Sequence, residues 1–476
     1  MLGRIFTVGG YTLLSRVTGL ARDIMLAAIL GAGPLADAFL VAWRLPNNFR
    51  AIFAEGAFNT AFIPAYAHVQ GKGGETSARL FADRIFTLLF FSQLALLVVA
   101  WLFMPQALVT LYGGMLNVMH RFASAAAASI FLNISMMATL ALVAFFPTAG
   151  HAAAWGVLIS GFLQYFLLAG DLARHGSLPR FAPLRLDEDV RAFFRAIGPA
   201  TLGSMGTQVA VFADTIIATF LPAGALSALY YAERLYQLPI GVIGIAIGTV
   251  LLPEMSQRIT AGDDRGAAAS QRRAFEFTLL ATVPFVAAFL AVPDVIVRAV
   301  FARGAYTRAD AAAAAVTLAA YAIGLIPFVT IRSAVSAFYA RKDTATPVKA
   351  SLAGLAVNLL LKIVLMGSLA QVGLALATAV GAWINLLLVL GFSVRAGYLD
   401  VDRAWLKSLA KFVAIGIGLG AVLWLTGHFA PPYFAQQARF RDETLLVLLM
   451  AVGAFVYGFS VLLLFGRGWL FALVRG

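Results

Sequence analysis

Apolar runs of about 20 residues recur along the whole sequence, and each is long enough to cross a hydrocarbon core of about 30 Å as an α-helix. The stretches between them are short, and none is a polar stretch longer than about 25 residues, which is too short to form a soluble domain with its own core. Only 12% of the residues are charged, about half the usual share in a soluble domain. The sequence therefore predicts an all-α membrane protein whose function lies inside the helix bundle or at its rims.

The runs predict a polytopic bundle of about fourteen spans. The expected spans are residues 5–30, 36–66, 84–104, 106–119, 122–146, 151–170, 193–220, 225–256, 275–300, 311–338, 347–367, 371–394, 405–427 and 443–466. The fourth is shortened and contains Gly113 and Gly114, so it either crosses the membrane or re-enters it. Thirteen full crossings is the alternative.

The basic residues predict the orientation of the bundle. The net charge is +13, but it is dispersed over many short loops without the clustered basic surface that nucleic-acid binding needs, so no nucleic-acid partner is expected. Loops 70–84, 171–195, 258–273, 341–349 and 395–407 carry most of these residues and alternate in side, which places both termini in the cytoplasm. The loop with Arg298, Arg303 and Arg308 falls on the outside and is an exception.

Metal and thiol chemistry are not expected. The chain has no cysteine, and its five histidines lack the spacing of metal ligands, so the sequence predicts no metal and no cofactor. Arg16, Arg22 and Asp23 follow the first apolar run where a signal peptide would carry small residues, so that run is expected to be a retained span. No catalytic constellation is visible, and an enzyme is not predicted.

An internal repeat indicates two lobes. The segment from Asp23 through Arg44 to Pro64 aligns with the segment from Asp214 through Arg234 to Pro253. The separations between corresponding residues differ by one position each, and both copies start a hairpin from the same side, as in parallel transporter repeats. The expected division is an N-terminal lobe at 1–190, a C-terminal lobe at 191–400 and a C-terminal helix pair at 401–476. Chance similarity between two apolar hairpins is the alternative.

Charged residues concentrate inside four of the predicted spans. Because charge at bilayer depth is costly, such residues normally face a partner or a wet cavity. The first two spans hold Arg16, Arg22, Asp23, Asp37, Arg44, Arg50 and Glu55, and the seventh and eighth hold Asp214, Glu233 and Arg234. Guanidinium groups cannot be neutralised by deprotonation, and their planar fork matches two phosphate oxygens. A central cationic cavity for a phosphate or pyrophosphate is therefore expected.

Two alternatives and one geometric requirement stay open for these charges. Asp37 follows Gly31, Gly33 and Pro34 and is placed equally well to stabilise a helix start. The arginines are alternatively all paired with neighbouring carboxylates. On an ideal helix Arg22 points about 120° away from Arg16, so bringing both arginines to one cavity requires a break at Gly19.

Lys362 is a further charge inside an apolar run. It lies one helical turn after Asn358 in the eleventh span, and Asp214 is its candidate counter-ion. Such a pair would close the second lobe or act as a tethered cation in place of a transported one. Snorkelling of the lysine to the interface is the alternative.

Several motifs resemble those of one transporter family. The sequence is similar to the MurJ/MviN lipid II flippases of bacteria, in the multidrug/oligosaccharidyl-lipid/polysaccharide exporter superfamily, over nearly the whole chain. The motifs are Ser15–Asp23 (SRVTGLARD), Gly31–Phe39 (GAGPLADAF), Leu45–Phe58 (LPNNFRAIFAEGAF), Tyr230–Leu235 (YYAERL) and Phe338–Lys349 (FYARKDTATPVK).

The resemblance implies a two-lobe bundle in the bacterial inner membrane that flips undecaprenyl-pyrophosphate-linked peptidoglycan precursor (lipid II) to the periplasmic face by alternating access. It implies cavity arginines at Arg16, Arg22, Arg50 and Arg234, with Asp37 and Glu55 as accompanying carboxylates, whereas Arg44 is added from the internal repeat. Spans 405–427 and 443–466 would form a groove for the lipid tail. Expected partners are lipid II, membrane lipids and cell-wall synthesis enzymes.

Two departures from the family pattern follow from the same comparison. The chain is shorter between its third and fifth spans than family members are, and Lys362 stands where sodium-binding members carry a carboxylate. The resemblance therefore gives no support for a sodium requirement. A flippase for another polyprenyl-linked glycan and a transport-inactive paralogue that scaffolds envelope enzymes are the alternative functions.

Overall fold

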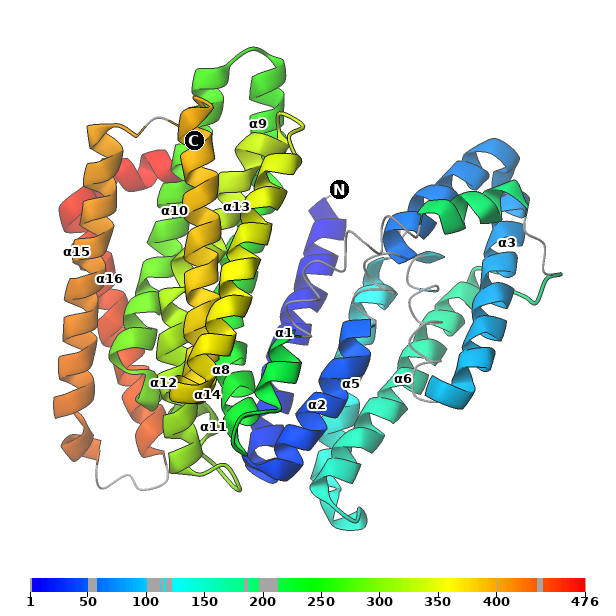
Figure 1. Cartoon of the computed structure of the whole chain (residues 1–476), viewed down its shortest axis with the longest axis horizontal. Helices are drawn as coiled ribbons and strands as arrows, with labels where there is room; N and C mark the ends of the chain where they lie inside the picture. The colour runs from blue at the N-terminus through cyan, green and yellow to red at the C-terminus, as the bar shows by residue number, and fades with distance from the viewer. Residues whose placement is uncertain are drawn as a thin grey trace. The chain divides into compact units, whose positions relative to one another are not determined.

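The protein is described from a computed structural model of the whole chain (Figure 1). The structure describes residues 2–49, 58–100, 112, 115–116, 122–183, 187–196, 213–399, 401–434 and 440–475, and the regular elements in these ranges are helices. The chain divides into two compact units, Met1–Ile216 and Ile217–Gly476. The predicted boundaries at 190 and 400 stay a prediction.

The first unit is built from helices that follow the predicted apolar runs. Its elements are α1 (Leu2–Leu30), α2 (Pro34–Phe49), α3 (Asn59–Ala100), α5 (Phe122–Ala141), the short helix η2 (Val143–Phe145) and α6 (Ala149–Arg174). Helix α5 packs between α1 and α6. The predicted fourth span, 106–119, lies mostly outside the described residues, so its crossing stays a prediction.

Glycines set the turns of the first unit. Gly31 and Gly33 have positive φ values of 69° and 157°, which side chains disfavour, and Pro34 then starts α2 with a φ suited to a first helical turn. Gly74, at φ 72°, divides the 42-residue α3 into two helical parts. Gly19, by contrast, lies inside the uninterrupted helix α1, so the break that was considered there does not occur.

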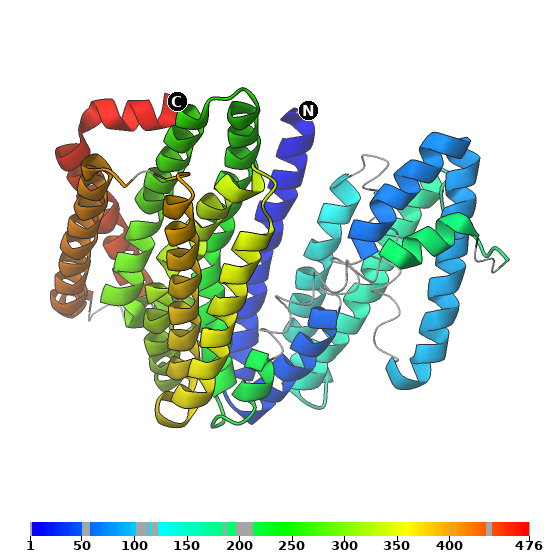
Figure 2. The ribbon, with the colours of Figure 1, turned by 45° about the horizontal axis from the view of Figure 1, so that its top comes forward.

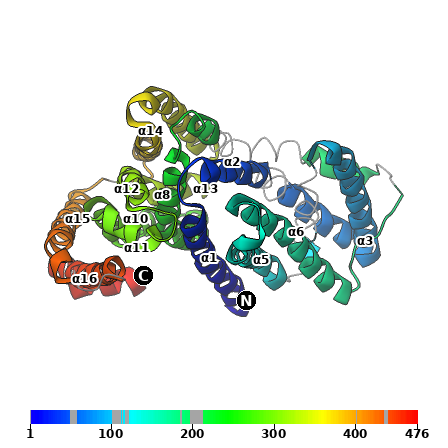
Figure 3. The same cartoon turned by 90° about the horizontal axis from the view of Figure 1, so that it is seen from below.

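The second unit holds the longest apolar helices (Figure 2). Its elements are α8 (Ala225–Pro239), the π-helical segment η3 (Ile240–Gly244), α9 (Ile245–Thr260), α10 (Asp264–Ala291), α11 (Pro293–Phe301), α12 (Arg308–Ile323), α13 (Leu325–Tyr339), α14 (Ala345–Arg395), α15 (Arg403–Phe429), η4 (Pro431–Phe434) and α16 (Arg441–Arg475). Viewed along the bundle, α14 lies on one side of the group formed by α8, α10, α12 and α13, and α15 lies against α10 on another side (Figure 3).

Six helices in the described part of the chain are long and apolar enough to cross a membrane. One of them, α14, has 51 residues, and a straight helix of that length would extend about 76 Å, far beyond the hydrocarbon core. The backbone reverses at Ala370 (φ 45°, ψ −128°) and makes two half-helices that agree with the predicted spans 347–367 and 371–394. The halves approach closely at Gly381, where an added Cβ would lie 2.7 Å from the Asn358 Cβ.

One end of the second unit forms a basic rim. The turns between α9 and α10, between α13 and α14, and between α14 and α15 all lie at this end, as the predicted alternation of loops requires (Figure 1). Arg341 contacts Asp264 at 2.6 Å, and Arg272 contacts Asp402 at 2.8 Å. Hydrogen bonds from the Trp405 amide and from Arg272 lower the pKa of Asp402 below its usual value. Asp402 therefore stays ionised at neutral pH and caps α15.

The opposite end explains the exception to the charge pattern. Arg298 lies 3.4 Å from Asp442 and also pairs with Asp294, Arg308 lies 3.7 Å from Asp442, and Arg303 lies 3.3 Å from Glu443. These arginines are therefore compensated by carboxylates on their own side of the bundle. The pairs also join the α11–α12 turn to the start of α16, because Asp442 and Glu443 lie in its first turn.

We expect Asp442→Ala to destabilise the second unit by about 1 kcal/mol, because it removes the carboxylate that Arg298 and Arg308 share. Thermal unfolding of the purified protein in detergent measures this. The matched control is Glu75→Ala, which removes a single exposed pair with Arg79 and should change the melting temperature little. Equal melting temperatures for the two variants would contradict the role of the shared carboxylate.

Candidate functional site

Arg22 is held inside the first unit by groups from three helices. Its guanidinium donates from Nε and Nη2 to Asp23 Oδ1 at 3.1 and 2.7 Å, and from Nη1 to Asn133 Oδ1 at 3.0 Å. The guanidinium carbon lies 5.3 Å from the centre of the Trp43 ring. Only 6% of Arg22 and 2% of Asp23 are exposed. For Arg22 the structure therefore agrees with the alternative that the arginines are paired with neighbouring carboxylates.

Asn133, on α5, is a residue that the sequence analysis missed. Its side-chain amide donates to the Ser15 carbonyl and to Thr18 Oγ1, both at 3.0 Å, while its carbonyl accepts from Arg22. Both amide donors point to α1, so the orientation of the amide is fixed and its oxygen faces the guanidinium. Gly19 lies beside this amide, where an added Cβ would be 3.6 Å from Asn133 Nδ2, an ordinary van der Waals distance.

The other predicted residues of the first unit are half-buried on α1 and α2 or lie outside the described residues. Arg16 and Arg44 are half-buried, on α1 and α2. Asp37 is half-buried in the first turn of α2, where a carboxylate interacts favourably with the helix N-terminus. Arg50 and Glu55 lie outside the described residues, so their places in a cavity stay predictions.

The second unit holds Arg234 against an aromatic ring. Arg234 Nη2 donates to the Tyr230 hydroxyl at 3.1 Å, and its guanidinium carbon lies 4.6 Å from the centre of that ring. Glu233, the neighbouring carboxylate, accepts from Gln237 at 2.8 Å. An aromatic face and a hydrogen-bond acceptor therefore hold Arg234, as they hold Arg22.

The predicted repeat has a structural counterpart in helix register. Arg44 is the eleventh residue of α2 and Arg234 is the tenth residue of α8. Each helix follows a turn with a positive-φ glycine, at Gly33 before α2 and at Gly224 before α8. The alignment of Arg44 with Arg234 thus places both arginines about three turns into corresponding helices.

Lys362 is buried within α14, with only 1% of the residue exposed. The alternative of a lysine that snorkels to the interface is therefore wrong. Asn358, one turn earlier, has a buried Oδ1 without a hydrogen-bond partner among the described residues. Asp214, a residue of the first unit, is half-buried in a helical stretch at 213–218, and its pairing with Lys362 stays a prediction.

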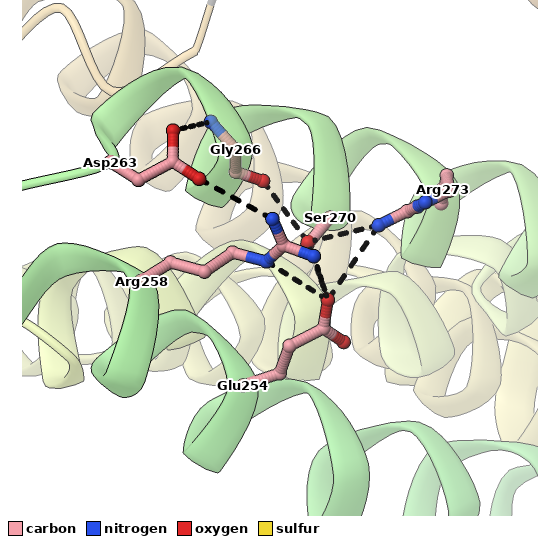
Figure 4. A network of polar contacts seen from close by, with 6 residues as sticks. All are labelled: Glu254, Arg258, Asp263, Gly266, Ser270 and Arg273. Carbon is pink, nitrogen blue, oxygen red and sulfur yellow. Dashed lines mark hydrogen bonds and ion pairs between the residues drawn. The ribbon is translucent and has the colours of Figure 1, made fainter. Parts of the chain in front are cut away.

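A separate polar network lies at the basic rim of the second unit (Figure 4). Glu254 Oε1 accepts from Ser270 Oγ at 2.7 Å and lies 3.1 and 3.6 Å from Arg258 and Arg273. Asp263 caps α10 by accepting from the Gly266 amide at 2.8 Å and lies 3.4 Å from Arg258. These contacts close the α9–α10 turn.

Within the described ranges, no group of three or more histidine, aspartate or glutamate side chains is arranged to hold a metal ion. The charged groups that the structure brings together are guanidinium donors with carboxylate and amide acceptors. Guanidinium donors of this kind are suited to binding and orienting an anion.

Comparisons with known proteins identify the family. The family described as "Lipid II flippase MurJ" matches residues 26–111 and 106–441. The "Probable lipid II flippase MurJ" of Rhizobium meliloti (strain 1021) is 36% identical over 97% of this chain and 93% of its own length. The "Lipid II flippase MurJ" of Burkholderia cenocepacia (strain ATCC BAA-245 / DSM 16553 / LMG 16656 / NCTC 13227 / J2315 / CF5610) is 30% identical over 95% of this chain and 96% of its own length.

Solved structures agree on the fold. A structure titled "Lipid II flippase MurJ, inward closed conformation" covers 97% of this chain and 99% of its own, with a TM-score of 0.80 and 22% identity. An inward-facing multidrug resistance MATE family transporter of the MOP superfamily covers 82% of this chain and 97% of its own, with a TM-score of 0.63 and 13% identity. From the family match and the relatives together, the chain belongs to the MurJ family of transporters, multi-pass proteins of the bacterial membrane.

Proposed function

We propose that this chain flips lipid II, the polyprenyl-pyrophosphate-linked precursor of peptidoglycan, from the cytoplasmic to the periplasmic leaflet of the inner membrane. Family membership and the names of relatives that match nearly the whole chain support this substrate. The observation that carries the mechanism is Arg22, a buried guanidinium whose fork holds one carboxylate oxygen. The comparisons favour neither a flippase for another glycan nor an inactive scaffold.

In this mechanism a phosphate oxygen of the substrate takes the place of Asp23 Oδ1 on Arg22. The two donors that meet on that oxygen, Nε and Nη2, have the spacing that a phosphate also accepts. Asp23 compensates the arginine while no substrate is bound, which lowers the cost of keeping the charge at membrane depth. Asn133 and Trp43 hold the guanidinium plane in both situations.

The remaining predicted residues complete the proposed pathway. Further hydrogen bonds to the pyrophosphate would come from Arg16, Arg44 and Arg50 of the first unit and from Arg234 of the second. The charge of these arginines would be balanced by Asp37, Glu55 and Glu233. The lobes would then rock around the bound headgroup with no covalent step, so the protein is a transporter and not an enzyme. We place both termini in the cytoplasm, and the helix pair 401–476 beside the lipid tail.

Lys362 is proposed as a tethered cation of the second unit. Its burial and its place one turn after Asn358 put a positive charge inside α14 that cannot be exchanged with the solution. Transport would then need no sodium ion at this position, and membrane potential or protons would drive it. Contacts with cell-wall synthesis enzymes stay a prediction from the family resemblance.

Replacing Arg22 or Arg234 with alanine is expected to abolish rescue of a flippase-depleted strain while the protein still reaches the membrane, because each substitution removes a fork for the diphosphate. Colony formation and membrane immunoblots measure the two properties. Arg79→Ala is the matched control, since Arg79 is an exposed arginine paired only locally with Glu75. Normal growth with both Arg22→Ala and Arg234→Ala would reject the mechanism.

Asp23→Asn is expected to lower the KM for lipid II in a reconstituted flipping assay, because a neutral amide competes less strongly with phosphate for Arg22. A hydrogen bond to a charged group contributes about 1.5–3 kcal/mol, which corresponds to a change on the order of 10- to 100-fold. An unchanged or raised KM would show that Asp23 does not compete with the substrate.

Asn133→Asp is expected to raise the KM by at least about 10-fold with little change in the maximal rate, because a second carboxylate at Nη1 of Arg22 would neutralise the guanidinium and repel the phosphate. A lower amount of folded protein with normal kinetics would indicate that Asn133 only supports the packing of α1 against α5. Initial rates over a series of lipid II concentrations separate the two outcomes.

A further inference from the structure

The last part of α16 leaves the direction of the rest of the helix. Gly466 has φ 79° and ψ 163°, which end the spanning part, and helical structure then continues to Arg475. Figure 2 shows this terminal segment, residues 467–475, running across the end of the second unit, whereas the preceding part of α16 runs along the bundle. A helix in this direction lies in the plane of a membrane surface when the bundle crosses the membrane.

Specific contacts fix the bend. Lys411 of α15 donates from Nζ to the Leu464 carbonyl at 2.6 Å, one of the carbonyls that the break at Gly466 leaves without a helical partner. Trp469 donates from Nε1 to Glu276 Oε2 at 3.0 Å, and its ring lies 4.2 Å from that of Phe465. The segment is therefore attached to α10 and α15 at its beginning.

The sequence of the terminal segment is typical of an interfacial helix. Arg467 and Arg475 flank the run from Trp469 to Val474, in which every residue is apolar or aromatic. Trp469 has the amphipathic ring that is enriched at membrane–water interfaces. The segment also lies at the basic rim, the end that the charge pattern of the loops assigns to the cytoplasm.

We propose that residues 467–475 form an interfacial helix that docks on the anionic phospholipid headgroups of the cytoplasmic leaflet. The proposal rests on the orientation given under the proposed function. Two observations favour a lipid surface over the diphosphate of the substrate. Arg467 and Arg475 are eight residues apart, about 12 Å along a helix, a spacing that suits the separate headgroups of a lipid surface. Arg467 is also exposed, whereas Arg22 is buried.

The test uses the absence of cysteine from the chain, which makes any introduced thiol unique. Full-length Ala472→Cys is reconstituted into vesicles of phosphatidylcholine alone or of phosphatidylcholine with phosphatidylglycerol. The rate of reaction with a charged, membrane-impermeant maleimide is then measured on the protein population whose basic rim faces the reagent. We expect the rate to be about fivefold or more lower in the anionic vesicles, because each basic residue near such a surface strengthens its docking.

Two reference positions calibrate the labelling. Ala261→Cys, in the exposed α9–α10 turn at the same rim, should react fast in both kinds of vesicle. Phe455 is 74% exposed on the spanning part of α16, where lipid would surround it. Phe455→Cys should therefore react slowly in both kinds of vesicle. The labelling rate of Ala472→Cys should become equal in the two kinds of vesicle at high salt, which screens the charges. It should also become equal when Arg467→Gln and Arg475→Gln are combined with Ala472→Cys.

Equal rates for Ala472→Cys in the two kinds of vesicle would overturn the proposal. Slow labelling in lipid-free detergent that becomes fast when the protein is diluted would also overturn the proposal. Such a result would indicate that the segment contacts a second copy of the chain. Labelling requires no transport, so its outcome is independent of the Arg22 and Arg234 experiments. Fast labelling at position 261 from the periplasmic side of intact cells would refute the orientation itself.

Discussion

A guanidinium group at membrane depth constrains everything packed around it. It cannot lose its charge, and the hydrocarbon core offers no water, so the protein must supply acceptors and a polarisable surface. For Arg22 these come from Asp23 on the same helix, Asn133 on α5 and Trp43 on α2. The packing of α1 against α5 therefore positions an acceptor for Arg22 in addition to burying apolar side chains. In the structure Asp23 is part of the compensation, so an anion that binds Arg22 as proposed would take the place of Asp23.

The apolar periodicity of the sequence was enough to predict most helices of the second unit. The reversal within α14 falls between two predicted spans, and the basic turns gather at one end as the charge alternation requires. These features follow from local composition and from helix length, which one sequence contains. The division of the 311–338 span at Gly324 was not predicted, because a glycine within an apolar run only sometimes ends a helix.

The network around Arg22 could be predicted only in part. The neighbouring carboxylate was visible in the sequence, although ideal helix geometry suggested that adjacent side chains diverge by about 100°. Long side chains bridge that angle, so Arg22 and Asp23 meet within an unbroken helix. Asn133 lies 111 residues away in an apolar run, where a single amide is indistinguishable from any buried polar residue. Only the packing of α1 on α5 brings it to the guanidinium.

Arg22 and Arg234 are held by contacts of different chemistry. Arg22 donates to a carboxylate and an amide, and the contacts of Arg234 include the hydroxyl and ring face of Tyr230. A phosphate that replaced Asp23 on Arg22 would compete with a full negative charge. A conformation in which Asp23 moves away from Arg22 would therefore bind the headgroup more tightly than the conformation in which the pair is formed. Because a ligand shifts a conformational equilibrium only through differential affinity, this difference gives the headgroup a physical means to favour one state of the transporter over another.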